Sequence, residues 1–229
     1  MLFYDPSYLL FMAPALILMA LASWYVRSAY NKWSRVPSNS RLTGAQAAQR
    51  LVSSGALYGV KIEGVGGNLS DHYDPRTKTL RLSQGVANNA SVAAVAIAAH
   101  ELGHAMQDAE DYLPLRLRAA LVPMVNIGSW LGWILIMIGL VLDMLNLAWL
   151  GVLVFSGGAL FALATLPVEL NASARAKQLL SETGIIQSEQ ERRGVNNVLN
   201  AAALTYVASL LTAILQLLYF ASLVSGRRR

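Results

Sequence analysis

A His-Glu-x-x-His motif, formed by His100, Glu101 and His104, holds the groups of this chain that are best suited to metal chemistry. Residues four apart on a helix lie on one face about one turn apart, so both imidazoles can reach a single ion. Glu101 falls beside them, where its carboxylate could take a proton from a water molecule on the metal. The motif predicts a metal-dependent hydrolase with two histidine ligands and a glutamate as general base.

A catalytic zinc ion usually has three protein ligands, so a third donor is expected elsewhere. The chain has no cysteine and three histidines, which leaves His72 or a carboxylate. Glu169 is the preferred candidate, because it follows Pro167 at the end of an apolar segment, at the depth of the membrane surface. The other interpretation of Glu169 is an acid that favours a helix N-terminus. Asp108, one turn beyond His104, and His72 remain alternative ligands, although Asp108 would leave the ion poorly enclosed.

Two residues of a predicted strand are candidates for contact with a substrate or a transition state. His72 lies between carboxylates and suits either a surface histidine or a hydrogen-bond donor. Tyr73 is a candidate oxyanion donor, and the alternative is an ordinary interfacial tyrosine.

The composition indicates a membrane protein. Hydrophobic residues make up 55% of the chain and charged residues 14%, whereas soluble domains have about 25% charged residues. Four apolar stretches reach the length of about 20 residues that a membrane-spanning helix needs. They are residues 8–26, 119–142, 144–166 and 198–224. Basic residues follow the first stretch and none precedes it, so we expect a retained anchor and not a cleaved signal peptide.

The basic residues predict the orientation. Residues 27–118 carry eleven Lys or Arg and residues 169–197 carry four, so both segments should be cytoplasmic by the positive-inside rule. Four spans then place the basic tail, residues 227–229, outside, so either the tail is an exception or the last stretch does not cross cleanly. No basic patch with interleaved aromatic residues is present, so the net charge of +5 indicates anionic lipid headgroups and no nucleic-acid partner.

The region between the first two spans resembles a small soluble domain. Thr43 is a plausible N-cap of a helix that runs to about Ser53. Alternating segments at residues 60–63, 69–73 and 79–82 predict a short antiparallel sheet. A second helix begins at Asn88 or Ser91, enters the metal motif and continues to about Asp108.

Several segments besides the motif resemble one family. They are Leu42-Thr43-Gly44, residues 71–76, residues 80–83, residues 98–107, the run Tyr112/Pro114/Leu115/Arg118/Pro123, and residues 167–173. In this order, over nearly the whole chain, they resemble the bacterial YugP-type multipass membrane zinc metallopeptidases, and more distantly the HtpX and CaaX-protease class. The resemblance implies one zinc ion on His100, His104 and a downstream glutamate, as in gluzincins, with Glu101 as base.

The chain departs from the more distant class at one position. Those enzymes typically have an aspartate four residues after the glutamate ligand, whereas this chain has Ser173. Asn171 and Ser173 are therefore candidates to orient a histidine, and Asn171 is also a candidate for contact with the substrate.

The expected fold is mainly α: a multipass membrane protein with about four transmembrane helices and a small cytoplasmic α+β, zincin-like catalytic part. Five segments are expected: an anchor (1–26), a catalytic region (27–118), a transmembrane hairpin (119–168), a cytoplasmic helix with the third ligand (169–197), and a final transmembrane helix with a basic tail (198–229). Glycines in the spans permit tight packing within one chain or between copies, so a homo-oligomer is possible.

The expected activity is that of a zinc metalloendopeptidase at the cytoplasmic surface of the cell membrane, acting on a peptide or membrane-protein substrate. The hairpin from Leu69 to Leu82 offers an edge on which an extended peptide could lie. One alternative is a non-catalytic metal-binding scaffold, against which an intact Glu101 argues. A transporter is a third option, with few polar residues in the spans to support it.

Overall fold

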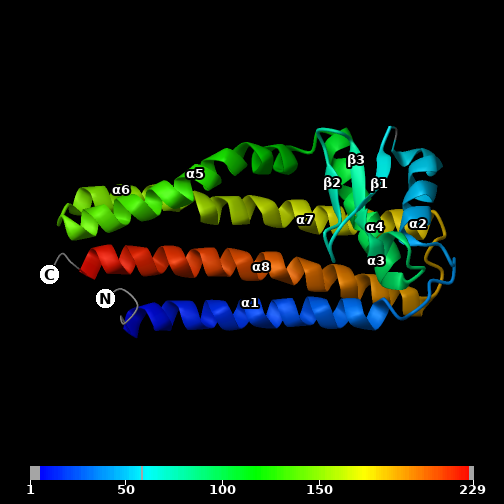
Figure 1. Ribbon diagram of the computed structural model, residues 1–229, viewed down its shortest axis with the longest axis horizontal. Helices are drawn as coiled ribbons and strands as arrows, with labels where there is room; N and C mark the ends of the chain where they lie inside the picture. The colour runs from blue at the N-terminus through cyan, green and yellow to red at the C-terminus, as the bar shows by residue number, and fades with distance from the viewer. Residues whose placement is uncertain (1–5, 58, 227–229) are drawn as a thin grey trace. The chain divides into compact units, whose positions relative to one another are not determined.

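The computed structural model describes residues 6–57 and 59–226, so the start of the predicted anchor and the basic tail lie outside the described residues. The elements are α1 (Pro6–Trp33), α2 (Gly44–Leu51), a π-helix η2 (Val52–Ala56), β1 (Lys61–Val65), β2 (His72–Asp74), β3 (Thr79–Ser83), α3 (Gln84–Ala87), α4 (Val92–Ala109), α5 (Leu113–Val141), α6 (Leu145–Phe155), α7 (Gly157–Glu182) and α8 (Glu189–Gly226). Within this part of the chain, four segments are long and apolar enough to cross a membrane: Tyr8–Trp33, Leu113–Val141, Leu145–Glu182 and Glu189–Gly226. The prediction of a mainly helical multipass membrane fold with a small sheet is confirmed (Figure 1).

Contacts between residues divide the chain into two compact units. One comprises residues up to 23, residues 113–167 and residues from 205 onward, and the other comprises residues 24–112 and 168–204. Helices α1, α7 and α8 contribute residues to both units. The five-segment division by membrane side stays a prediction.

The first unit is built on a tight hairpin of α5 and α6. A Cβ atom added to Gly139 would lie 2.4 Å from the backbone nitrogen of Ala148, so glycine is required where these helices cross. Asp143, at φ 58°, makes the turn between them. Large apolar side chains remain exposed on this unit, for example Trp130 and Leu153. Exposed apolar side chains of this kind are expected where a helix faces lipid.

The second unit contains the sheet, whose strand order is β1-β3-β2. The central strand β3 is buried at four of its five positions, including Leu80 and Leu82. Strand β2 pairs with β3 antiparallel, as predicted, whereas β1 pairs with β3 in parallel. The sheet is therefore mixed and not wholly antiparallel.

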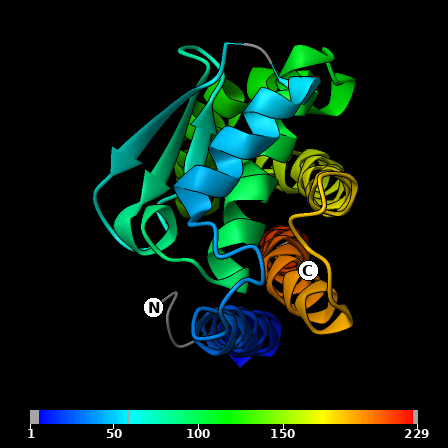
Figure 2. The ribbon, with the colours of Figure 1, turned by 90° about the vertical axis from the view of Figure 1, so that its right-hand side faces the viewer.

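Helix α4 passes through the core of the second unit. Ser91 is its N-cap, and the Ser91 hydroxyl accepts a hydrogen bond from the backbone N–H of Ala94. The small residues that precede the metal motif are almost all buried, which allows close packing around this helix. Figure 2 shows α4 with the strands on one side and the end of α7 on the other. The predicted helix start at Thr43 is also confirmed, since Thr43 and Gln46 form a capping box on α2.

Glu191 joins the start of α8 to the loop after α1. Its side chain is buried, at 2% exposure, and it accepts hydrogen bonds from the backbone N–H groups of Asn39, Gln187 and Ser188. The Ser188 hydroxyl also accepts a bond from the Glu191 N–H, which completes a capping box at this helix start.

We expect Glu191→Ala to destabilise the second unit, because it removes the charged acceptor of three partly buried backbone N–H groups, and a hydrogen bond to a charged group contributes about 1.5–3 kcal/mol. Thermal unfolding in detergent, followed by circular dichroism, should show a lower melting temperature. The matched control is Glu189→Ala, which removes an exposed carboxylate two residues away that makes only long surface pairs with Arg192 and Arg193. Equal melting temperatures for the two variants would contradict this account of Glu191.

Candidate metal centre

Three side chains from two helices converge in the second unit. His100 and His104 lie one turn apart on α4, and Glu169 reaches them from α7. The Glu169 Oε2 atom lies 3.3 Å from Nε2 of His100 and 3.5 Å from Nε2 of His104. The Glu169 side chain is only 3% exposed. Within the described residues these three groups form a cluster that could hold a metal ion.

The geometry of the cluster fits zinc. Zinc prefers imidazole nitrogen and carboxylate oxygen at about 2.0–2.2 Å in a tetrahedron, which places neighbouring donor atoms about 3.4 Å apart. The separations of the Glu169 oxygen from the two imidazole nitrogens agree with this spacing. All candidate ligand atoms lie within 4.8 Å of one another. Three protein donors would leave a fourth position open, as catalytic zinc sites do.

Gly103 allows the two helices to approach closely enough for this cluster to form. A Cβ atom at this position would lie 2.4 Å from the backbone oxygen of Ala172 on α7. Ala172 is fully buried and lies three residues after Glu169, on the same face of α7. The glycine between the two histidines therefore brings the backbone of α7, and with it Glu169, against α4.

The remaining ring nitrogen of each histidine also has a partner. Nδ1 of His104 lies 3.0 Å from Oε1 of Gln107, and Nδ1 of His100 lies 3.1 Å from Oγ of Ser173. The Gln107 amide nitrogen donates to the backbone oxygen of Val168, so its oxygen is the acceptor for His104. His104 then carries its proton on Nδ1 and presents the lone pair of Nε2 to the cluster. Such outer hydrogen bonds hold metal-binding imidazoles in their tautomer and orientation.

The hydrogen-bond chain continues from Gln107 to the surface. Gln107 also donates to Oδ1 of Asn171, which accepts a second bond from Nε of Arg175. The Arg175 guanidinium forms two parallel bonds with the Glu110 carboxylate, which lower the pKa of Glu110. These bonds join α7 to the end of α4 at residues both before and after Glu169 in the sequence. Several hydrogen bonds therefore hold Glu169 in position relative to the histidines.

Glu101 lies on the side of α4 that faces strand β2. Its carboxylate accepts a hydrogen bond of 3.1 Å from the backbone N–H of Tyr73. Burial raises the pKa of Glu101, although the neighbouring histidines lower it in part. Burial alone lowers the pKa of His104, but the bond to Glu169 and the nearby carboxylates raise it overall. The Glu169 carboxylate thus lies near both imidazoles, and the Glu101 carboxylate lies on the β2 side of α4.

Comparison with known proteins shows the family of this chain. A family described as "putative neutral zinc metallopeptidase" matches residues 8–225. The chain belongs to this family of zinc metallopeptidases. A relative from Bacillus subtilis (strain 168), described as "putative membrane protease YugP", is 44% identical over 214 residues, which are 93% of this chain and 95% of the relative. The comparison with solved structures finds no match.

The structure brings some of the predicted site residues together and leaves others apart. The backbone N–H of Tyr73 donates a hydrogen bond to Glu101, and the Tyr73 hydroxyl donates one to Asp108. Asp108 therefore lies outside the three-residue cluster, as does His72, which is exposed with Nδ1 beside the backbone oxygen of Ser70. The Asn171 amide oxygen is engaged by Gln107 and Arg175. The substrate contacts predicted for His72, Tyr73 and Asn171 stay predictions.

Gln107 has an extensively hydrogen-bonded side chain beside the cluster, and sequence reasoning assigned it no role. It is fully buried and bonds three groups. Its spacing was the available signal, because a residue three positions after His104 on a helix shares its face. However, the orientation of its amide also depends on the backbone oxygen of Val168 on α7. Spacing within α4 does not reveal a partner on another helix.

We expect Glu169→Gln to reduce zinc binding, because a neutral amide replaces the one carboxylate of the cluster. The loss in affinity should exceed the about 10- to 100-fold that loss of an outer hydrogen-bond partner causes. Zinc can be measured by mass spectrometry of the purified protein and by competition with a chelator. Glu182→Gln, on the same helix and exposed, is the control. Normal zinc affinity in Glu169→Gln would remove Glu169 from the ligand set.

Gln107→Leu should weaken zinc binding by about 10- to 100-fold while the fold is retained. The leucine fills the buried space but leaves Nδ1 of His104 and the backbone oxygen of Val168 without partners. The same chelator competition measures the change, with Gln178→Leu on the exposed side of α7 as the control. An affinity equal to that of the unmodified protein would show that Gln107 has no part in orienting His104.

Proposed function

We propose that this chain is a zinc metalloendopeptidase that cleaves peptide bonds at the cytoplasmic surface of the cell membrane, with His100, His104 and Glu169 as ligands and Glu101 as general base. The observation that carries the proposal is the approach of Glu169 to both histidines at the spacing of zinc ligands. Membership in a family of zinc metallopeptidases supports the same activity. One ion is proposed, because a single cluster of three ligands was found among the described residues.

The residues of the cluster suit hydrolysis in distinct ways. When bound, zinc polarises a carbonyl oxygen and lowers the pKa of a coordinated water. Glu101 is not one of the three clustered ligands, so its carboxylate remains available to take a proton and return it to the leaving amine. His100 and His104 stay neutral as ligands, each held by the partner on its other ring nitrogen.

Strand β2 is the proposed support for the substrate. It is an edge strand, since the order β1-β3-β2 leaves one of its sides without a neighbouring strand. The N–H of Tyr73 points from that side to Glu101. An extended peptide that lies along this edge would therefore place a backbone amide beside the proposed base.

The cytoplasmic location is supported by the distribution of basic residues. The second unit contains most of the Lys and Arg residues of the chain, and it contains the metal cluster as well. Cationic loops are retained on the cytoplasmic side of bacterial membranes. The site and the basic residues are therefore expected on the same side.

We expect Glu101→Gln to lower the rate of peptide cleavage by about 10²- to 10⁴-fold, the usual contribution of a general base, while zinc stays bound. A mixture of unstructured peptides incubated with the zinc-loaded protein in detergent, and analysed by mass spectrometry for new termini, measures this. Glu63→Gln, exposed on β1, should cleave as the unmodified protein does and controls for a contaminating protease. Unchanged cleavage in Glu101→Gln with zinc bound would reassign the base, and absence of cleavage by the unmodified protein would refute the peptidase proposal.

A further inference from the structure

A cavity of about 320 Å³ opens between strand β2 and the last two turns of α4. Its lining includes Tyr73 from the strand and Ala105 and Asp108 from the helix. The apolar residues Leu57 and Val60 complete one wall. The volume is at the lower end of the range of about 300–1,000 Å³ for small-molecule pockets, and is therefore ample for one amino-acid side chain.

This cavity adjoins the proposed catalytic groups. Ala105 follows the proposed ligand His104 directly, and Asp108 lies four residues beyond His104 along α4, a rise of about 6 Å. On the opposite wall, Tyr73 donates its backbone N–H to Glu101. Successive residues of an extended peptide are about 3.4 Å apart and alternate in direction. A side chain one or two residues from the cleaved bond could therefore enter the cavity.

The polar groups of the cavity present a negative charge. The Tyr73 hydroxyl donates to Oδ2 of Asp108 at 3.0 Å, so Asp108 is an acceptor. Burial and this bond raise the pKa of Tyr73, which keeps the phenol neutral. A carboxylate has about four lone-pair sites, so one bond leaves Asp108 able to accept more. Lys78 and Asp111 lie among the exposed lining residues with opposite charges, which offset one another.

We propose that this cavity receives a lysine or arginine side chain of the substrate next to the cleaved bond, with Asp108 as the residue that determines this specificity. The inference rests on the proposed peptidase function and adds its substrate class. The aliphatic stem of the cationic side chain would lie against Leu57 and Val60, and its charged head would meet Asp108. Tyr73 holds the Asp108 carboxylate in place through its hydroxyl.

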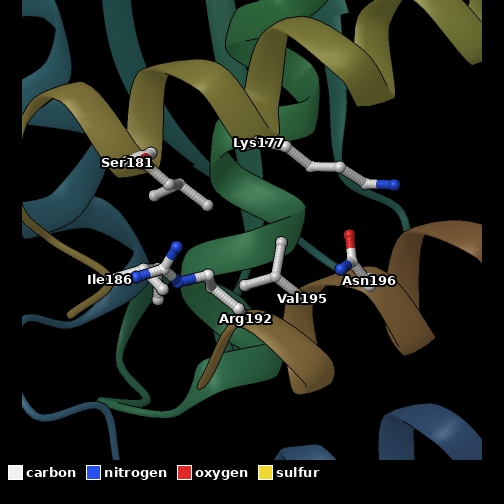
Figure 3. Close-up of a pocket in the computed structure, with 7 residues that line it drawn as sticks. Lys177, Ser181, Ile186, Arg192, Val195 and Asn196 are labelled. Atoms are coloured by element: carbon white, nitrogen blue, oxygen red, sulfur yellow. The ribbon is translucent and has the colours of Figure 1, made fainter. Parts of the chain in front are cut away.

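A second groove in the same unit has the opposite charge. It has a volume of about 190 Å³ and lies between the end of α7 and the start of α8, with Lys177 and Arg192 among its lining residues. Figure 3 shows these two cations together with the apolar Ile186 and Val195. A substrate cation would be repelled there. These two grooves thus differ in charge, and the acidic one lies beside the proposed catalytic groups.

The test uses full-length zinc-loaded protein with Glu101→Gln, so that bound peptides are not consumed. Peptides of otherwise neutral sequence carry arginine at each position in turn, and matched peptides carry citrulline, which has nearly the same shape without the charge. We expect at least one arginine peptide to bind about tenfold tighter than its citrulline partner, the scale of a hydrogen bond to a charged group. Adding Asp108→Asn should abolish this ratio, since asparagine can still accept the Tyr73 bond but has no charge. Arg192→Gln, in the basic groove, is the control and should keep the ratio.

Equal binding of arginine and citrulline peptides, or no measurable binding of either, would overturn the inference. A ratio that survives Asp108→Asn would overturn the role of Asp108. Cleavage of the same peptides by protein with Glu101 intact separates the inference from the proposed function. Cleavage without charge preference would refute the cationic subsite alone, whereas an arginine preference in binding without any cleavage would refute the peptidase activity and retain the cation-binding cavity.

Discussion

The close approach of α7 to α4 is the constraint on which the site depends. Gly103 and Ala172 meet backbone to backbone, and this contact carries the Glu169 carboxylate to the two imidazoles. A buried carboxylate is costly unless it is paired or binds a metal. Glu169 is nearly fully buried, and its carboxylate lies beside both histidines. The buried position of Glu169 is therefore better explained by a metal ligand than by an isolated acid, because a bound cation offsets the cost of burying the carboxylate.

A second layer of hydrogen bonds makes this approach specific. Gln107 bonds one histidine, a carbonyl of α7 and Asn171, while Ser173 bonds the other histidine. Buried polar networks of this kind stabilise one arrangement when every member has a partner, and are unfavourable when one is missing. Each imidazole is thus held on one nitrogen by the protein, and the other nitrogen faces the cluster. Ser173 bonds His100 directly, at 3.1 Å from Nδ1.

The sequence predicted those parts of the site that depend on spacing within one helix. The positions of His100 and His104 follow from a period of 3.6 residues, and Glu169 was found because zinc needs a third donor and few candidates remained. Gln107 was missed since its partner, the Val168 carbonyl, belongs to another helix. The direction of β1 was missed for a different reason: alternation along a strand has the same period whether its neighbour is parallel or antiparallel. The pairing of β2 with β3 is different, because a short turn between neighbouring strands allows only antiparallel pairing.

Helix α7 contains both an apolar segment and the proposed ligand Glu169. It runs without a break from Gly157 through Pro167 to Glu182, and Glu169 lies two residues beyond the proline. The apolar part of this helix ends near Pro167, so the carboxylate lies within the first turn after the apolar part. Glu169 is thus supplied by the same helix as an apolar segment, but the contact that holds its carboxylate beside the histidines is the buried one between Gly103 and Ala172.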